Sequence, residues 1–472
     1  MSNPRGESTC NDMTSRESSA APSNIFGTDG IRDRGGRGWL APDGLRRLAH
    51  AIARWGGSTS DEAPRVLIGR DPRTSGPEIE AILRDELERG GAVVRAGGIL
   101  PTPAVSMLVS SGTADIGIVI SASHNPPEDN GVKLFRSDGR KLTIAEEESI
   151  SADALAATGE GDAPSELAPA DFVDADLRAE YLDRLLASFG EGPFLDGLHV
   201  ILDCARGATS VCALEAFERA GARVEAVHAD PSGEEINRGC GSTHPEAIAG
   251  VVLARGADLG IAFDGGGDRA ILVDAKGETV DGDDMLALWA LDLKRRSELP
   301  NDRIAVTVMS NAGMERYLTD AGISLARTPV GDREVHQAML KEGLALGGEQ
   351  SGHLIVGEAA TGDGIRTGLA MARIVKESGK PLHELRAPIP RYPQTLTRVE
   401  VGSKPPLESI PAVMEIVAQG EAALADRGRI LLRYSGTEPV ARILVEGADE
   451  SENREWAEKI AAVLREQPEL CA

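Results

Sequence analysis

Residues 116–135 read IGIVISASHNPPEDNGVKLF, and this stretch carries the strongest fold signal of the chain. Its first six residues, IGIVIS, form a nearly unbroken apolar run, which is typical of a β-strand covered on both faces. A polar loop follows, and the Asn130-Gly131 turn leads back into a second apolar run. Because similar short runs alternate with amphipathic helical stretches along the chain, we predict an α/β fold with mixed sheets.

This alternation of strand and helix signals restarts twice, which predicts three related α/β domains in succession. An acidic, alanine-rich stretch at 151–174 is expected to be a surface connection. After the proline-rich residues 388–393 (PIPRYP) the pattern changes, which predicts a small α+β domain that acts as a lid over a central cleft. The expected boundaries are 1–23 for a disordered tail, 24–190, 191–299 and 300–387 for the α/β domains, and 388–472 for the lid domain.

Charge and cysteine content exclude several classes of protein. The 472 residues include 75 acidic and 50 basic side chains, a formal net charge of −25, which argues against a nucleic-acid or anionic-membrane partner. The five cysteines show no CxxC spacing and are expected to be reduced thiols. No apolar run approaches the ~18 residues of a membrane span, and the polar first 23 residues contain no signal sequence. We therefore expect a cytoplasmic protein.

The loop after IGIVIS is the first candidate for chemistry. Ligands of open α/β sheets bind beyond the carboxyl ends of strands, where Ser123 and His124 stand. A serine there can be a nucleophile or a phosphate carrier, and Lys133 can supply positive charge or a proton. The alternative is a plain turn, since Asn, Pro, Asp and Gly are the usual turn residues.

A second loop, FDGGGDR at 263–269, also follows an apolar strand. Asp264 and Asp268 offer hard oxygen ligands on a glycine-rich loop, which suits Mg²⁺ together with phosphate oxygens and water. Arg269 is placed to meet a phosphate beside that metal. The alternative is a hairpin turn that leads into the following strand.

Two later loops complete the set. GGEQSGH at 347–353 offers Glu349, Ser351 and His353 as groups that can bind sugar hydroxyls, although a glycine-rich capping loop is the alternative. RYSGTEPVAR at 433–442 combines two arginines with hydroxyls and backbone amides, which predicts a phosphate nest. Its candidate residues are Arg433, Ser435, Gly436, Thr437 and Arg442.

In order and content these four loops resemble those of the α-D-phosphohexomutase superfamily, the phosphoglucomutase/phosphomannomutase family, whose four domains each give one loop to a central cleft. The resemblance covers roughly residues 24–446, and Gln350 in the third loop is typical of bacterial members that act on glucosamine phosphates. Further matching motifs are FGTDGIRD (26–33), IGRDPRTSG (68–76), GCGSTHPE (239–246), TPVGDRE (328–334), TGDG (361–364) and RYSGTEP (433–439).

The resemblance implies an isomerase that interconverts glucosamine 6-phosphate and glucosamine 1-phosphate in amino-sugar nucleotide biosynthesis. A phosphorylated Ser123 would exchange its phosphoryl group with the sugar through a hexosamine 1,6-bisphosphate, which is both intermediate and activator. Ser123, Asp264 and Asp268 would hold Mg²⁺, and Arg32 and Lys133 would be general base and acid. A monomer or homodimer is expected.

The same resemblance assigns the remaining candidates. Arg269 would contact the transferred phosphoryl group, and Glu349 and Ser351 would contact the sugar. The phosphate that does not react would be bound by Arg433, Ser435, Gly436, Thr437 and Arg442.

Two positions depart from the family pattern. Gly266 stands where a third aspartate is expected in the metal loop, which should weaken Mg²⁺ binding. Asp33 stands where a glycine is usual, and an acid beside Arg32 could pair with it. Two alternatives therefore stay open: the same reaction on mannose or glucose phosphates, and a non-catalytic sugar-phosphate-binding protein.

Overall fold

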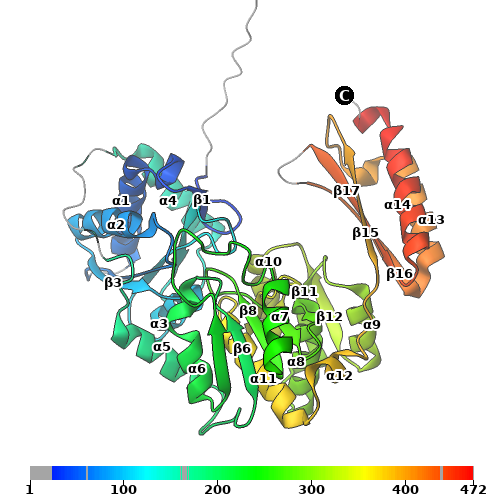
Figure 1. The fold of residues 1–472 in the computed structure, drawn as a ribbon. Helices are drawn as coiled ribbons and strands as arrows, with labels where there is room; N and C mark the ends of the chain where they lie inside the picture. Colours follow the sequence, from blue (N-terminus) through cyan, green and yellow to red (C-terminus); the bar gives the residue numbers. More distant parts are fainter. Residues whose placement is uncertain are drawn as a thin grey trace, which may run out of the picture.

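The computed structural model describes residues 24–59, 62–159, 161, 167, 169–435 and 439–470. These residues form four sheets in chain order, each with its own helices (Figure 1). Three are mixed sheets and the last is a small antiparallel sheet, so the predicted fold class is confirmed. The predicted tail, 1–23, lies outside the described residues.

The first domain has the strand order β1-β5-β4-β2-β3. Strands β2, β3 and β4 are parallel, with β3 at the edge, and β5 returns antiparallel to β4. The strands are β1 (Ile31–Arg34), β2 (Arg65–Arg70), β3 (Val93–Ile99), β4 (Ile116–Ile120) and β5 (Asp129–Phe135). The helices are α1 (Pro42–Thr59), α2 (Gly76–Arg89), α3 (Thr102–Ser110), α4 (Ile144–Ala156) and α5 (Ala175–Ala187).

Helix α4 corrects one expectation, because residues 151–156 belong to it and not to a surface connection. Thr143 and Glu146 form a reciprocal capping box at its start, which fixes where the helix begins. Ser151 and Ala154 are buried. Asp153, which is half-buried, is the one acid among these six residues, so they belong to a packed helix and not to an acidic surface segment.

The second and third domains repeat the arrangement, with strand orders β10-β9-β8-β6-β7 and β12-β11-β13-β14. The strands are β6 (His199–Asp203), β7 (Arg223–Val227), β8 (Leu259–Phe263), β9 (Ala270–Asp274), β10 (Thr279–Val280), β11 (Arg303–Thr307), β12 (Ser324–Thr328), β13 (Leu346–Gly348) and β14 (Leu354–Val356). The helices are α6 (Ala213–Arg219), α7 (Glu246–Arg255), α8 (Gly282–Arg295), α9 (Ala312–Asp320), α10 (Asp332–Glu342), α11 (Gly364–Ser378) and α12 (Leu382–Arg386).

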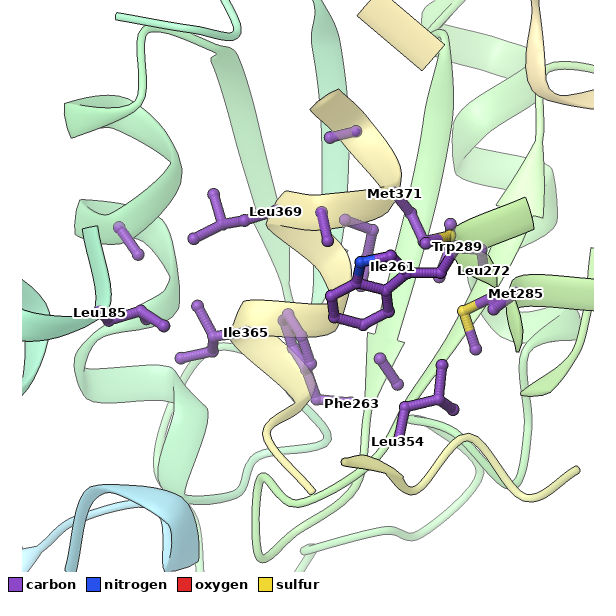
Figure 2. Packing of buried hydrophobic residues seen from close by; sticks show 14 of the residues in the cluster. Leu185, Ile261, Phe263, Leu272, Met285, Trp289, Leu354, Ile365, Leu369 and Met371 are labelled. Atoms are coloured by element: carbon purple, nitrogen blue, oxygen red, sulfur yellow. The ribbon is translucent and has the colours of Figure 1, made fainter. Parts of the chain in front are cut away.

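One continuous hydrophobic core runs through these three domains. Figure 2 shows its centre, where Ile365 and Leu369 of α11 lie with Ile261 and Phe263 of β8 and Trp289 of α8. Helix α11 follows the third sheet in sequence, yet it packs against strands of the second. Because the two domains bury apolar surface in common, their relative position is fixed by packing.

The C-terminal domain has a separate core. Its sheet has the order β15-β17-β16, and helices α13 and α14 cover one face (Figure 1). Its elements are β15 (Gln394–Glu400), α13 (Pro411–Leu424), β16 (Gly428–Tyr434), β17 (Val440–Gly447) and α14 (Glu450–Arg465). Short 3₁₀ helices complete the described part: η1 (Gly38–Leu40), η2 (Ala208–Val211), η3 (Pro300–Asp302), η4 (Leu407–Ser409), η5 (Ala425–Arg427) and η6 (Pro468–Leu470).

Among the described residues, no helix combines the length and the apolar character that crossing a lipid bilayer requires.

Candidate active site

All four candidate loops connect antiparallel neighbours in a sheet. They join β4 to β5, β8 to β9, β13 to β14, and β16 to β17. The turn alternative given for each of the first two loops is therefore correct as local structure. It does not exclude a functional role, because a loop between two strands presents polar side chains at a defined place at the edge of the sheet.

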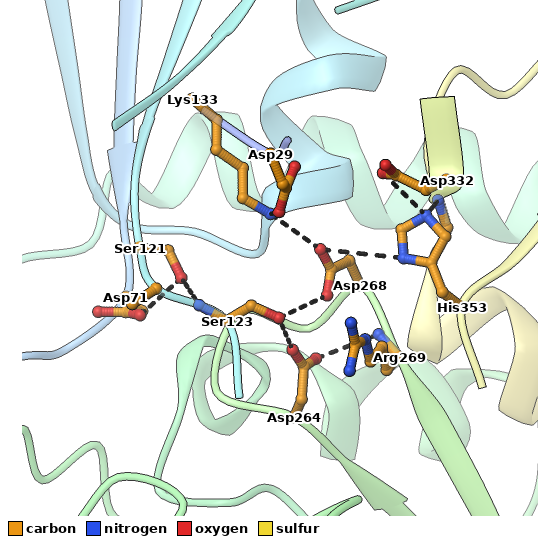
Figure 3. Close-up of polar contacts among 12 residues, drawn as sticks. Asp29, Asp71, Ser121, Ser123, Lys133, Asp264, Asp268, Arg269, Asp332 and His353 are labelled. Atoms are coloured by element: carbon orange, nitrogen blue, oxygen red, sulfur yellow. Dashed lines mark hydrogen bonds and ion pairs between the residues drawn. The ribbon is translucent and has the colours of Figure 1, made fainter. Parts of the chain in front are cut away.

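Ser123 is the point where two of these loops meet (Figure 3). Its hydroxyl donates to Asp264 Oδ2 at 2.5 Å and lies 3.2 Å from Asp268 Oδ1. Its own backbone N–H donates to Ser121 Oγ, which in turn donates to Asp71. Ser123 has φ +53°, a left-handed conformation that costs a non-glycine residue about 1 kcal/mol. The surrounding hydrogen bonds hold the serine in this strained geometry.

Asp264 and Asp268 form a buried carboxylate pair. Burial, reinforced by the charge of Asp268, raises the pKa of Asp264 to about 7. Burial alone would also raise the pKa of Asp268, but Lys133, His353 and Arg269 outweigh it and lower that pKa. Two carboxylates and a hydroxyl are hard oxygen donors, and the excess negative charge between them favours a cation. These residues therefore fit Mg²⁺.

Lys133 lies behind this pair, fully buried between two acids. Its Nζ is 2.9 Å from Asp29 and 3.2 Å from Asp268. Burial opposes the charged form, but the two carboxylates prevail and raise the pKa of Lys133. The lysine therefore remains an ammonium that brings fixed positive charge beside Ser123 and Asp268.

An ion-pair network connects the first and third domains around the same point. Asp29 also contacts Arg32 at 2.6 Å and Lys141 at 2.5 Å, and Lys141 in turn pairs with Asp332 at the start of α10. Burial would raise the pKa of Asp29, but the three cations hold it well below its usual value. Asp29 and Asp332 were not among the candidate residues, although both lie inside motifs that resembled the family.

A cavity of about 430 Å³ opens beside these groups, between the first three domains. Its lining includes six of the predicted site residues together with Asp29 and Asp332. The six are Arg32, His124, Asp268, Arg269, Glu349 and His353. Ser123 and Asp264 lie just behind the wall, bonded to Asp268 and to the backbone of Arg269. Residues as far apart in the sequence as Ile25 and His353 thus form one pocket.

Several polar atoms at this pocket have no hydrogen-bond partner among the described residues. They are Nε of Arg32, Nδ1 of His124 and Nε of Arg269. Burial and the nearby charges of Arg269 and Arg32 lower the pKa of His124 to about 4, so its ring is neutral. Unpartnered nitrogens in a cavity lined by arginines indicate a site for a polar, negatively charged ligand.

The third loop meets the expectations only in part. Glu349 lines the cavity and accepts from the Gly331 N–H at 3.2 Å, and His353 lies between Asp268 at 4.0 Å and Asp332 at 3.5 Å. Ser351 does not line the cavity. Gln350 is turned away as well, because its amide donates to Asp281 at 3.2 Å.

Asp33 does not pair with Arg32. Neighbouring residues of a strand point to opposite faces, and Arg32 is instead bound by Asp29 at 2.6 Å, while Asp33 accepts from the Arg34 N–H. The proposed influence of Asp33 on Arg32 is therefore wrong.

The phosphate-nest residues lie on the C-terminal domain, away from this cavity. Arg433 of β16 stands directly opposite Arg442 of β17, and Arg398 of β15 stands opposite Arg442 on its other side. The register therefore makes a row of three arginines on the sheet face that the helices leave open. Ser435 is buried at the end of this row, and Gly436 and Thr437 lie outside the described residues.

Arg398 was missed from the sequence because nothing in a single strand reveals its cross-strand partner. Directly opposed like charges destabilise a sheet unless an anion compensates them. The row is thus suited to a phosphate group.

A separate group of possible metal ligands lies at the ends of β6 and β7. Ligand atoms of Asp203, His228 and Cys240 are within 4.8 Å of one another. Both carboxylate oxygens of Asp203 already accept backbone N–H groups, from Ala205 and Gly241 at 2.9 Å. The carboxylate thus has a structural role in this turn.

Comparison with known proteins defines the class. Models of the phosphoglucomutase/phosphomannomutase family match four successive segments: alpha/beta/alpha domain I at 23–159, domain II at 179–277, domain III at 281–392, and the C-terminal domain at 396–463. The chain belongs to the phosphoglucomutase/phosphomannomutase family. The predicted family and the expected isomerase class are thereby confirmed.

Two similar curated relatives within the family are both named phosphoglucosamine mutase. Phosphoglucosamine mutase of Mycolicibacterium gilvum (strain PYR-GCK) is 44% identical over 441 residues, 93% of this chain and 98% of the relative. Phosphoglucosamine mutase of Moorella thermoacetica (strain ATCC 39073 / JCM 9320) is 44% identical over 443 residues, with the same coverage. A phosphoglucomutase/phosphomannomutase family protein from Burkholderia thailandensis has the same fold, with a TM-score of 0.77 at 24% identity, covering 94% of this chain and 98% of that one.

Proposed function

We propose that the protein interconverts glucosamine 6-phosphate and glucosamine 1-phosphate. One observation carries the proposal: the Ser123 hydroxyl lies 2.5 Å from Asp264 and 3.2 Å from Asp268, beside a cavity lined by arginines. A serine held between metal-binding carboxylates and cations has the surroundings that a phosphoryl carrier needs. The relatives named phosphoglucosamine mutase support glucosamine as the sugar.

Ser123 carries the phosphoryl group in the resting enzyme. The bond from phosphorus to Ser123 Oγ breaks while a bond from phosphorus to the free hydroxyl oxygen of the substrate forms. That hydroxyl gives its proton to the general base, and Ser123 Oγ takes a proton from the general acid. The resulting hexosamine 1,6-bisphosphate then reverses its orientation in the site. Its other phosphoryl group then returns to Ser123, which releases the isomeric monophosphate and regenerates the phosphoserine.

Asp264, Asp268 and a phosphoserine oxygen would hold Mg²⁺, which when bound neutralises charge on the phosphoryl oxygens. The chain's own cations act on the same group. Lys133 is fixed by Asp29 and Asp268, so it needs no rearrangement to stabilise developing negative charge. Arg269 and His124 face the cavity with unpartnered nitrogens that can donate to or orient phosphate oxygens. Arg32 remains the predicted general base, and Lys133 remains the predicted general acid.

The sugar and the idle phosphate are bound by different loops. Glu349 and His353 reach the cavity and would bind sugar hydroxyls, with Ser351 adjoining them. The C-terminal domain, 388–472, would close over the substrate as a lid. Its arginine row, with Ser435, Gly436 and Thr437, would hold the phosphate that does not react, in either orientation of the sugar. We also propose a cytoplasmic enzyme that works as a monomer or homodimer.

The test is a coupled mutase assay with glucosamine, glucose and mannose 6-phosphates, run on wild type and Ser123→Ala. We expect the highest kcat/KM on glucosamine 6-phosphate, and no measurable turnover by the variant. Glucosamine as the poorest of the three substrates would overturn the substrate assignment. Intact-mass analysis provides the second readout: a chain that gains no phosphate even after glucose 1,6-bisphosphate would favour a binding protein.

A further inference from the structure

Asn237 uses every hydrogen-bonding group of its side-chain amide to join two loops of the site. Its Nδ2 donates to the carbonyl of Ser123 at 2.9 Å and to that of Asn125 at 3.0 Å. Its Oδ1 accepts from the N–H of Gly265 at 2.9 Å. The residue is 7% exposed and does not line the substrate cavity. It therefore connects the serine loop directly with the loop that carries the two aspartates.

The backbone of Asn237 is itself held in place. Its N–H donates to the Ala205 carbonyl at 3.0 Å, and its φ of +60° is left-handed. Asparagine adopts this conformation more readily than other residues with a side chain, apart from aspartate. The amide is thus presented from a rigid position in the second domain.

The serine loop has a second anchor of different origin. Arg73, fully buried in the first domain, donates from Nη2 to the Ser123 carbonyl at 3.1 Å and to the Asn125 carbonyl at 2.8 Å. These bonds fix the loop relative to its own sheet. Asn237 binds the same two carbonyls from the second domain, which also carries Asp264 and Asp268. It therefore fixes the loop relative to the carboxylates.

We propose that Asn237 is a positioning residue that sets the distance between Ser123 Oγ and the carboxylates of Asp264 and Asp268. The inference rests on the proposed function, since that gap is where the phosphoryl group would sit. A backbone bond from the Thr102 N–H to the Gly266 carbonyl, at 2.9 Å, also crosses between the two loops' domains. Loss of the amide should therefore misalign the site without separating the domains.

The test compares Asn237→Gly with Asn301→Gly. Glycine adopts the left-handed backbone readily and removes the side chain with its amide, and the control carries the same gain in backbone freedom. Asn301 is a matched control because it has φ +59° and a side-chain bond to the Glu342 carbonyl at 3.3 Å, outside the site. We expect kcat of Asn237→Gly to fall about 100-fold with KM changed less than about threefold, because misplacement by about 1 Å has that effect. Asn301→Gly should keep wild-type kinetics.

A folded Asn237→Gly with kcat within about threefold of wild type would overturn the inference. If Asn237→Gly loses its cooperative unfolding transition, kcat is measured for Asn237→Asp and compared with wild type in the same way. This variant retains the acceptor for the Gly265 N–H and loses the two donors. Wild-type protein without mutase activity would instead overturn the proposed function, and the inference with it. Unaltered kcat in the variant of an active enzyme overturns the inference alone.

Discussion

The hydroxyl of Ser123 and the carboxylate of Asp264 lie 2.5 Å apart, although 141 residues separate them in the chain. The same hydroxyl is 3.2 Å from Asp268. A hydroxyl has only one proton to donate, so it cannot satisfy both buried carboxylates fully. The two carboxylates are therefore suited to bind a group with more positive charge than the serine hydroxyl supplies.

Asp264→Asn removes one of the two carboxylates that are the proposed metal ligands. Mutation of residues that only hydrogen-bond to metal ligands typically lowers metal affinity or activity about 10–100-fold. We therefore expect loss of a ligand to lower activity at a fixed, limiting Mg²⁺ concentration at least about 100-fold. The matched control is Asp274→Asn, a buried aspartate that accepts from the N–H groups of Lys276 and Glu278 and can be replaced by an amide acceptor. A Mg²⁺ titration on both variants checks this, and equal curves would contradict it.

Gly266→Asp adds a carboxylate beside the metal-binding pair, but the structure shows that it also adds crowding. A Cβ at this position would lie 3.2 Å from Ser123 Cα and 3.2 Å from Ser121 Oγ. Gly266→Ala separates the two effects, because it adds only the Cβ. We expect Gly266→Asp to reach half-maximal activity at a lower Mg²⁺ concentration than Gly266→Ala. Identical titrations would mean that another group already completes the metal shell.

Lys141→Met breaks the link between the first and third domains. It removes the cation that Asp29 and Asp332 share, two acids that are 25% and 14% exposed, while Asp29 keeps its contacts with Arg32 and Lys133. Loss of these partly buried pairs should cost more than the ~0–1 kcal/mol of an exposed pair. We expect a clear fall in the thermal unfolding midpoint. Arg454→Met, which breaks an exposed pair with Glu450 on α14, should leave the midpoint nearly unchanged. Similar midpoints for the two variants would contradict the expected role of Lys141.

Asp283→Asn should change how stability depends on pH. Burial, together with the charge of Asp281, raises the pKa of Asp283 to about 7. Between its ordinary pKa and this value the folded protein binds more protons than the unfolded chain, so wild type loses stability as pH rises through that window. The variant has no such loss. The thermal unfolding midpoint of the variant minus that of wild type should therefore be larger at pH 8 than at pH 4. Asp320→Asn, exposed on α9, is the control.

Arg398→Gln tests the arginine row of the C-terminal domain. Hydrogen bonds to a charged phosphate are worth about 1.5–3 kcal/mol, so we expect KM for the sugar phosphate to rise at least about tenfold with a smaller change in kcat. The KM of the variant should also respond less to salt. Arg454→Gln supplies the control for loss of one surface charge on the same domain. An unchanged KM would show that Arg433 and Arg442 bind the phosphate without Arg398.

Much of the fold could be predicted from local patterns. The apolar run at 116–121 became β4, and the restarts of the strand and helix alternation became successive mixed sheets. Hydrophobic periodicity reports such elements because each must bury one face or both. It failed at residues 151–156, which were assigned to a surface connection together with the acidic residues after them, although they form the last part of the packed helix α4. Local patterns also do not show that residues 208–219 form two helices, η2 and α6, which are divided at Cys212 by its φ of −144° and ψ of −24°.

The sequence by itself determined the family of the protein and indicated which loops are candidates for the chemistry, because those loops are contiguous motifs whose residue types limit their possible reactions. Only the tertiary structure decided which side chains meet. It joined Ser123 to Asp264, paired Arg32 with Asp29 rather than with Asp33, turned Gln350 toward Asp281, and aligned Arg398 with Arg442. These contacts depend on strand register and on how separate domains pack, and both are set by the burial of apolar surface across the whole chain.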